Sequence, residues 1–340
     1  MPRTLVNTEG RHTRSRLFGR ELPMPMVIAP TGLNGMLTHR ADFKLAAAAA
    51  KAGIPFTLST VANARPDEVA RESGGALWMQ LYWFREPAIP ADVVRRAAEA
   101  GCEALVFTTD ANVFGHREWD KRSYRGPGQL TWRSFLDVGL HPRWIWDVMV
   151  PRGLPRFVNV ADFFPPEARS AKAGVTRIPA LFAATIDWDD VARLRDTWKG
   201  RLLIKGILDP ADVERSVRLG CDGVVLTNHG GRQLDACIAP IEVLPEIARA
   251  FGDRTTILID GGIRRGSDIA KAIALGAHAV MIGRATLYGV AAGGEPGASH
   301  ALEILRSELD RVLGQLGCRS LAELGPGLLR EGAPTATAGW

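Results

Sequence analysis

The 340-residue chain has few cysteines and no long apolar segment. Its cysteines, Cys102, Cys221, Cys237 and Cys318, are widely separated and form no C-x-x-C motif, which argues against a disulfide framework or a metal site. No run of 18 apolar residues occurs, so we expect no membrane-spanning helix. The N-terminus also lacks the apolar stretch of a secretory signal. These absences favour a cytoplasmic protein with reduced thiols.

Two common nucleotide-binding motifs are missing as well. Neither G-x-x-x-x-G-K-[ST] nor G-x-G-x-x-G occurs, which disfavours ATP, GTP or a Rossmann NAD site. The 42 basic and 37 acidic side chains leave a net charge of only +5. This small excess suits anionic ligands or an acidic membrane surface, and we expect no nucleic-acid partner.

Eight short apolar runs predict strands that are buried on both faces. Each run is bounded by turn residues, and helix-patterned segments lie between them. This alternation requires parallel pairing with right-handed crossovers, so we expect a single α/β domain over residues 1–340, a (β/α)8 TIM barrel. An open doubly wound sheet is the alternative. The runs begin at Met24, Phe56, Leu77, Ala104, Leu202, Gly223, Thr256 and Ala279, and the helices are expected at 42–52, 66–73, 91–100, 189–198, 210–219, 241–251 and 267–275.

The fourth and fifth strands are separated by a long insert, at about residues 119–187. Loops of this length tend to be functional. The insert combines tryptophans such as Trp132 and Trp146 with many arginines, a composition typical of an interfacial membrane patch. We therefore expect residues 131–180 to contact a membrane surface. A lid over the active site and an oligomer contact are the alternatives.

Glycines and arginines follow the seventh and eighth strands. Residues 260–268 read DGGIRRGSD, and Gly283-Arg284 follows the last strand. In barrels these two loops form the usual phosphate site, because glycine lets backbone N–H groups approach the anion and arginine adds charge. The pattern predicts a phosphorylated ligand, whereas turn glycines with surface arginines would be the structural reading.

The remaining polar residues at the predicted strand tips suggest acid–base chemistry. His229 ends the sixth strand, and Arg232 follows it across two glycines, which suits proton removal beside a bound carboxylate. Asp110 could orient His229, or it could cap a helix. Lys205 ends an apolar strand, where an unpaired ammonium is costly; a Schiff-base nucleophile and a fixed charge beside a cofactor are both open.

Several ordered motifs together carry a resemblance to a known family. From about Leu17 to Cys318 the chain resembles the FMN-dependent α-hydroxy acid dehydrogenase/oxidase family, and within it the branch that oxidises (S)-mandelate. The motifs are VIAPTGLNGM, LSTVAN, LWMQLYWF, TTDANVFGHRE, LLIKGIL, TNHGGRQLD, DGGIRRGSDI and MIGRATLYG.

The resemblance implies a role for each of these residues. His229 matches the base that takes the α-hydrogen of a small 2-hydroxy acid, and Asp110 matches its partner. Arg232 and Arg117 match arginines that bind the substrate carboxylate, and Tyr82 matches a tyrosine that hydrogen-bonds to substrate. Lys205 then corresponds to the lysine beside flavin N1. The positions matching FMN contacts are Pro30, Thr31, Gly32, Ser59, Gln80, Thr108, Lys205, Thr227, Asp260, Gly261, Gly262, Ile263, Arg264, Gly283 and Arg284.

The resemblance also implies an acceptor, an assembly and a location. Gly32 stands where many oxidases of the family carry alanine, which favours a dehydrogenase that passes electrons to a quinone-type acceptor. An oxygen-dependent oxidase is the alternative. We expect a homotetramer or larger, peripheral on the inner face of the cytoplasmic membrane. Family members begin with roughly 50 further residues that cover the barrel floor and supply an active-site tyrosine. Either the start site of this chain is misassigned, or the protein has a truncated lid, an exposed floor and one fewer carboxylate contact. An inactive flavin-binding homologue is a further reading.

Overall fold

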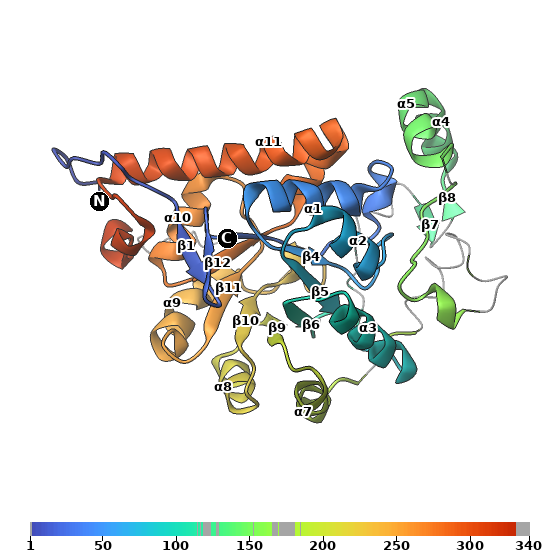
Figure 1. Cartoon of the computed structure of the whole chain (residues 1–340), viewed down its shortest axis with the longest axis horizontal. Helices are drawn as coiled ribbons and strands as arrows, with labels where there is room; N and C mark the ends of the chain where they lie inside the picture. The colour runs from blue at the N-terminus through green and yellow to red at the C-terminus, as the bar shows by residue number, and fades with distance from the viewer. Residues whose placement is uncertain are drawn as a thin grey trace, which may run out of the picture.

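Eight parallel strands close into a barrel in the computed structural model (Figure 1), which describes residues 2–113, 115, 117, 124–126, 129–151, 153–164, 169, 181–183 and 185–330. The hydrogen-bonded order is β10-β11-β12-β3-β4-β5-β6-β9, so the last strand pairs with the first. This confirms the predicted (β/α)8 barrel. The strands are β3 (Met26–Ile28), β4 (Phe56–Leu58), β5 (Leu77–Leu81), β6 (Ala104–Thr108), β9 (Arg201–Ile207), β10 (Gly223–Leu226), β11 (Thr256–Ile259) and β12 (Ala279–Ile282).

Helices follow the strands and cover the outside of the barrel (Figure 1). Their ends carry the expected signals. Asp209 caps the helix at Pro210 by accepting a hydrogen bond from the backbone N–H of Ala211, at 2.7 Å. Gly53 ends the first helix with a φ of +67°, which glycine adopts without steric cost. The helices are α1 (Ala41–Ala52), α2 (Pro66–Ser73), α3 (Ala88–Glu99), α7 (Trp188–Thr197), α8 (Pro210–Arg218), α9 (Pro240–Phe251), α10 (Gly266–Ala274) and α11 (Arg284–Leu316).

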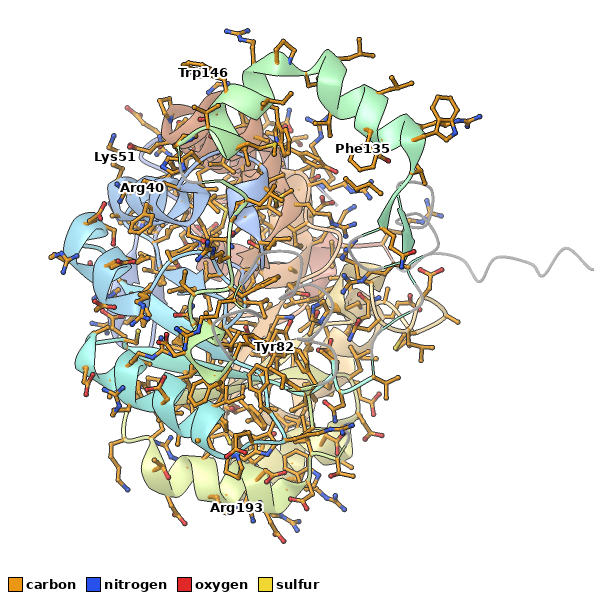
Figure 2. All side chains as sticks on the ribbon, turned by 90° about the vertical axis from the view of Figure 1, so that its right-hand side faces the viewer. Arg40, Lys51, Tyr82, Phe135, Trp146 and Arg193 are labelled. Atoms are coloured by element: carbon orange, nitrogen blue, oxygen red, sulfur yellow. The ribbon has the colours of Figure 1, made fainter. Side chains whose placement is uncertain are left out.

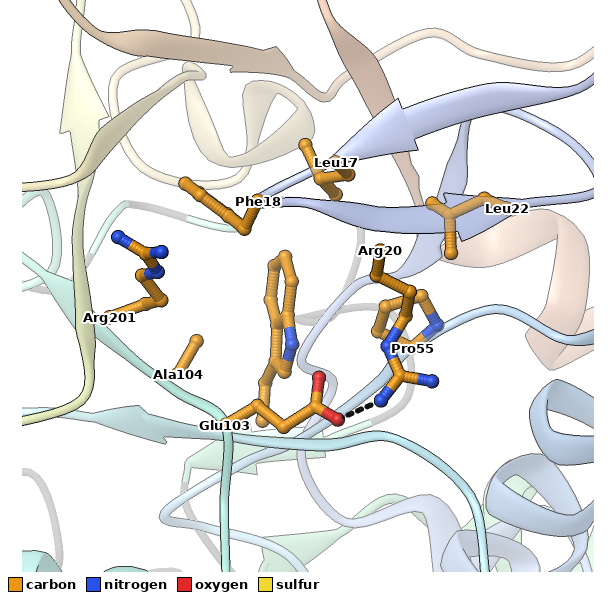
Figure 3. Close-up of a pocket in the computed structure, with 9 residues that line it drawn as sticks. Leu17, Phe18, Arg20, Leu22, Pro55, Glu103, Ala104 and Arg201 are labelled. Carbon is orange, nitrogen blue, oxygen red and sulfur yellow. Dashed lines mark hydrogen bonds and ion pairs between the residues drawn. The ribbon is translucent and has the colours of Figure 1, made fainter.

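The barrel floor is closed by a hairpin near the start of the chain. Strands β1 (Ser15–Leu17) and β2 (Arg20–Leu22) pair antiparallel. Leu17 and Leu22 are buried against the apolar residues that fill the barrel interior, among them Trp78 and Leu203. A pocket of about 300 Å³ remains beside the hairpin, where Arg20 pairs with Glu103 (Figure 3). The expectation of an exposed floor is therefore wrong.

The insert after β6 contains structure that the sequence patterns did not predict. Its described elements include β7 (Tyr124–Gly126), β8 (Gln129–Leu130), α4 (Trp132–Leu140), α5 (Pro142–Trp144), the π-helix η3 (Ile145–Met149) and the 3-10 helix η4 (Ala161–Phe163). Helices α4 and α5 stand apart from the barrel (Figure 1). Within the part of the chain described here, no helix is both long enough and apolar enough to cross a membrane.

Buried and partly buried polar contacts anchor the insert to the barrel. The indole N–H of Trp144 donates to the carbonyl of Met36, at 2.7 Å. Asp147 accepts from the hydroxyl of Thr38, at 2.6 Å. Further along, the fully buried Asn159 donates to the carbonyl of Ala64, at 3.0 Å, and its own carbonyl accepts from Arg96. The insert is thus attached to the loops that follow β3 and β4.

Candidate active site

An imidazole–carboxylate pair lies at the strand tips. His229 follows β10 and Asp110 follows β6, and His229 Nδ1 lies 3.0 Å from Asp110 Oδ1 and 3.1 Å from Oδ2. The histidine adopts a φ of +58°, an uncommon value for a non-glycine residue. Its backbone N–H donates to Thr227 Oγ1, at 2.9 Å, which supports this turn. Because Nδ1 faces the carboxylate, Nε2 is the nitrogen left to act as a base.

Asp110 is held as a carboxylate. Burial alone would raise the pKa of Asp110, but the hydrogen bond from His229 and the charge of Lys205 lower it below its usual value. A charged partner at Nδ1 fixes the tautomer of the ring and stabilises an imidazolium. The predicted pairing of His229 with Asp110 is present in the structure.

Lys205 provides a buried positive charge at the end of β9. Its Nζ lies 3.0 Å from Asp260 Oδ2 and 3.5 Å from Thr227 Oγ1, and its side chain is 5% exposed. Burial alone would lower the pKa of Lys205, but the charges of Asp260 and Asp110 raise it. A lysine that stays protonated is a poor nucleophile, which favours the fixed charge over the Schiff base.

The predicted substrate-binding side chains come from three separate loops. Arg117 Nε donates to the backbone carbonyl of Arg232, at 3.4 Å, so these two arginines lie in adjacent segments. Tyr82 follows β5 and packs edge-on against Phe182, with ring centroids 4.9 Å apart. Burial and the charge of Asp110 raise the pKa of Tyr82, so its phenol stays protonated and can donate a hydrogen bond.

A buried hydrogen-bond chain joins three of the predicted cofactor residues. Gln80 Nε2 donates to Thr108 Oγ1, and Gln80 Oε1 accepts from Ser59 Oγ, both at 3.1 Å. The same oxygen accepts from the backbone N–H of Thr60. These contacts cross from β4 over β5 to β6, and they fix the amide orientation of Gln80.

The loops after β11 and β12 have the backbone that a phosphate site needs. Gly261 and Gly262 adopt φ values of +88° and +81°, which favour glycine. Arg284, at the start of α11, donates to the carbonyl of Gly230, at 3.1 Å. Arg265, by contrast, pairs with Glu308 on α11, at 2.8 Å. Of the two arginines in the DGGIRRGSD motif, Arg265 is therefore committed to a structural contact, and Arg264 remains the predicted ligand.

The residues present fit FMN. Thr31 Oγ1, in the loop after β3, is buried and has no hydrogen-bond partner within the described ranges, and a buried hydroxyl of this kind calls for one. The buried ammonium of Lys205 is the kind of charge that would stabilise an anionic flavin ring. The other positions predicted to hold FMN, namely Pro30, Gly32, Ile263, Gly283 and Asp260, lie on the same rim, after β3, β11 and β12.

A family model described as FMN-dependent dehydrogenase matches residues 1–331. The chain belongs to this family. It is 42% identical to (S)-mandelate dehydrogenase of Pseudomonas putida over 99% of this chain and 84% of that one. It is 40% identical to L-lactate dehydrogenase of Caulobacter sp. (strain K31), over 97% and 86%. A crystal structure of the monotopic membrane protein (S)-mandelate dehydrogenase superimposes with a TM-score of 0.91 at 42% identity, covering 97% and 87%.

Membership of this family makes the protein an FMN-dependent dehydrogenase and confirms the predicted cofactor. The assignment of individual residues to the cofactor and the substrate stays a prediction. Sequence reasoning missed a second layer of polar residues behind the rim, namely the buried Asn34, Asp42 and Asn159 and the half-buried Asn63. An acid in the first turn of an alanine-rich helix looks like an ordinary helix-start signal, so the pattern around Asp42 gave no sign of this role.

Proposed function

We propose that the protein oxidises an (S)-2-hydroxy acid, mandelate or a similar aromatic one, to the 2-oxo acid. The observation that carries the proposal is the contact between His229 and the ionised Asp110 on the rim that also bears Lys205. FMN, when bound, would accept the two electrons that leave the substrate carbon, together with the proton of the substrate hydroxyl group. All other steps belong to side chains of this chain.

The imidazole of His229 acts as the base in the proposed reaction. His229 Nε2 takes the α-hydrogen of the substrate as a proton, and Asp110 stabilises the cation that forms at the ring. Arg117 and Arg232 bind the substrate carboxylate and stabilise the negative charge that develops beside it. Tyr82, protonated because of its raised pKa, donates a hydrogen bond to the substrate. Lys205 holds its charge near the cofactor through the ion pair with Asp260.

An aromatic substrate is favoured by the side chains around Tyr82. Tyr82 belongs to a cluster with Val61, Phe84 and Phe182, and the ring of Phe182 contacts both Tyr82 and Phe84. Such a wall suits the phenyl group of mandelate better than the methyl group of lactate. The 42% identical relative acts on (S)-mandelate, which supports the same choice.

The absorption spectrum of the FMN-loaded protein tests the proposal. Anaerobic (S)-mandelate should bleach the flavin band, and (R)-mandelate should not. His229→Ala should retain FMN and lose the bleaching. A flavin that stays oxidised with mandelate, lactate and glycolate alike would refute the activity and favour the inactive flavin-binding reading. Hydrogen peroxide formed in air as fast as a dye is reduced would favour the oxygen-dependent oxidase.

We further propose that the acceptor is a membrane quinone, and that α4 and the segment after it bind the inner face of the cytoplasmic membrane. Figure 2 shows Phe135 and Trp146 on helices at the edge of the molecule. The exposed large apolar side chains of this segment, which we call the apolar face, are Leu130, Trp132, Phe135, Leu136, Leu140, Trp146, Met149, Val150 and Leu154. An exposed patch of this kind marks an interaction site. The similar crystal structure is named as that of a monotopic membrane protein, which supports a membrane partner.

Sedimentation with anionic vesicles tests the apolar face. Replacing Phe135, Leu136 and Trp146 together with serine should leave the protein in the supernatant. The matched control replaces Tyr288 and Ile304, exposed apolar residues on α11, and should still sediment. If the triple variant and the control variant were recovered in the supernatant to the same extent, the apolar face would have no role in vesicle binding. The predicted homotetramer or larger assembly is tested by light scattering of the detergent-solubilised protein.

A further inference from the structure

The carboxylate of Asp42 bridges two loops of the active-site rim. Asp42 lies in the first turn of α1 and is 2% exposed. Its Oδ1 accepts from Asn34 Nδ2, and its Oδ2 accepts from the backbone N–H of Asn63, both at 2.8 Å. Asn34 belongs to the loop after β3, which carries Thr31 and Gly32. Asn63 belongs to the loop after β4, which carries Ser59. Each oxygen therefore holds a different loop.

The Asn34 side chain relays this contact to Thr31. Its Nδ2 donates both to Asp42 Oδ1 and to the backbone carbonyl of Thr31, at 3.1 Å. Its Oδ1 is buried and has no partner among the residues described. The two accepting oxygens fix which end of the amide faces them. Without an acceptor at position 42, the longer hydrogen bond to the Thr31 carbonyl alone would oppose a turn of the amide, and a turned amide would leave that carbonyl without its donor.

Asn63 ties the same two loops together a second time. Its Oδ1 accepts from the backbone N–H of Gly35, at 2.8 Å, and its Nδ2 donates to the carbonyl of Arg156 in the insert, at 2.7 Å. The backbone N–H of Leu33 donates to the carbonyl of Val61, at 3.0 Å. Asp42 thus sits at the centre of a network whose members reach both predicted cofactor loops.

We propose that Asp42 is a positioning residue for FMN, acting through Asn34 on the loop that carries Thr31 and Gly32. The proposal rests on the predicted placement of those two residues beside the cofactor. A purely stabilising role accounts poorly for the observations. Burial raises the pKa of Asp42 to about 6, and only neutral donors contact its oxygens. An ionised carboxylate at this buried position lowers the free energy of unfolding. Its two oxygens, however, accept the hydrogen bonds that hold the two loops.

Flavin affinity in a double-mutant cycle tests the proposal, using the quenching of FMN fluorescence by the apoprotein. Asp42→Asn leaves one accepting oxygen for two donors. The backbone N–H of Asn63 cannot turn and competes for that oxygen; the new NH2 group then faces Asn34, whose amide turns to accept from it and draws Nδ2 away from Thr31. We expect Asp42→Asn and Asn34→Ala each to raise the Kd for FMN by about 3- to 10-fold, the effect of one lost hydrogen bond. The double variant should bind no more weakly than the weaker single variant, because both changes break one relay.

The matched control is Asp67→Asn, which removes an exposed carboxylate from the first turn of the neighbouring helix α2 and should leave the Kd unchanged. Unchanged FMN affinity and flavin midpoint potential in both Asp42→Asn and Asn34→Ala would overturn the proposal, and so would fully additive losses in the double variant. If Asp42→Asn does not fold, the Kd for FMN of Asn34→Ala alone tests the relay to Thr31, and an unchanged Kd overturns the proposal. FMN binding needs no substrate, so wild-type protein that binds FMN but is not reduced by hydroxy acids would refute the proposed function and leave this test intact.

Discussion

Replacing Asp110 with asparagine should slow flavin reduction by about two orders of magnitude without removing FMN. Asp110 lies 3.0 Å from His229 Nδ1 and retains its charge in the folded protein. Two unit charges about 4 Å apart attract by about 4 kcal/mol at an effective dielectric constant of about 20. The side chains of His229 and Asp110 are 21% and 15% exposed, so solvent screens part of this. We expect a loss of about 2–3 kcal/mol in transition-state stabilisation, or about 30- to 150-fold in rate.

Anaerobic stopped-flow absorbance at saturating (S)-mandelate measures this rate directly. The ratio of flavin to protein absorbance reports FMN content in the same sample. Asp189→Asn, an exposed carboxylate on α7 far along the chain, controls for the loss of one negative charge. Asp110→Asn protein that bleaches at the wild-type rate would refute the assigned role of the pair. If FMN content fell in proportion to the rate, Asp110 would instead belong to the cofactor site.

Three further predictions concern the cofactor rim. Lys205→Met should leave Asp260 buried without its cation and cost about 3–5 kcal/mol of unfolding free energy, measured with urea; wild-type stability would contradict the ion pair. Gly32→Ala would place Cβ 2.5 Å from Val61 Cγ2 and should cost about 1–3 kcal/mol in thermal melts, less in a Val61→Ala background; equal losses in both backgrounds would argue against the clash. Because the pKa of Asp42 is about 6 in the folded protein against 3.8 ordinarily, the folded state binds the extra proton. Wild-type should therefore lose about 2 kcal/mol relative to Asp42→Asn as pH rises from about 4 to 6, and about 3 kcal/mol over the whole range from below about 3 to above about 7; parallel stability curves would exclude this.

The barrel was predictable because its signal is local. A strand buried on both faces must be apolar almost throughout, and each of the eight runs coincides with a strand of the structure. Helix α11 was not predicted, because Gly293, Gly294 and Pro296 interrupt its pattern. The chain is indeed non-helical at the two glycines. The elements of the insert were missed for a related reason, since exposed apolar side chains on α4 do not follow the pattern of a helix packed on a core.

The predicted site depended on topology as much as on motifs. Residues that end parallel strands must meet at one rim, so His229 and Asp110 could be paired although 119 positions separate them. What could not be predicted is which polar side chains serve the fold instead. Arg265 has the same sequence context as Arg264, and only the position of Glu308 on a later helix shows that it faces away. Long-range contacts of this kind leave no trace in local spacing.

Two largely buried carboxylates, Asp110 on the rim and Asp42 behind it, show why charge alone does not mark function here. Asp110 is surrounded by His229 and Lys205, and their hydrogen bond and charge lower its pKa against the effect of burial. Asp42 is contacted by amide and backbone donors, which lower its pKa less than burial raises it. At neutral pH both are ionised, but only Asp110 has its pKa lowered by a neighbouring ammonium, that of Lys205. A neutral residue at position 42 would avoid the cost of a buried charge; the carboxylate is explained if the two loops need both of its oxygens to hold the flavin.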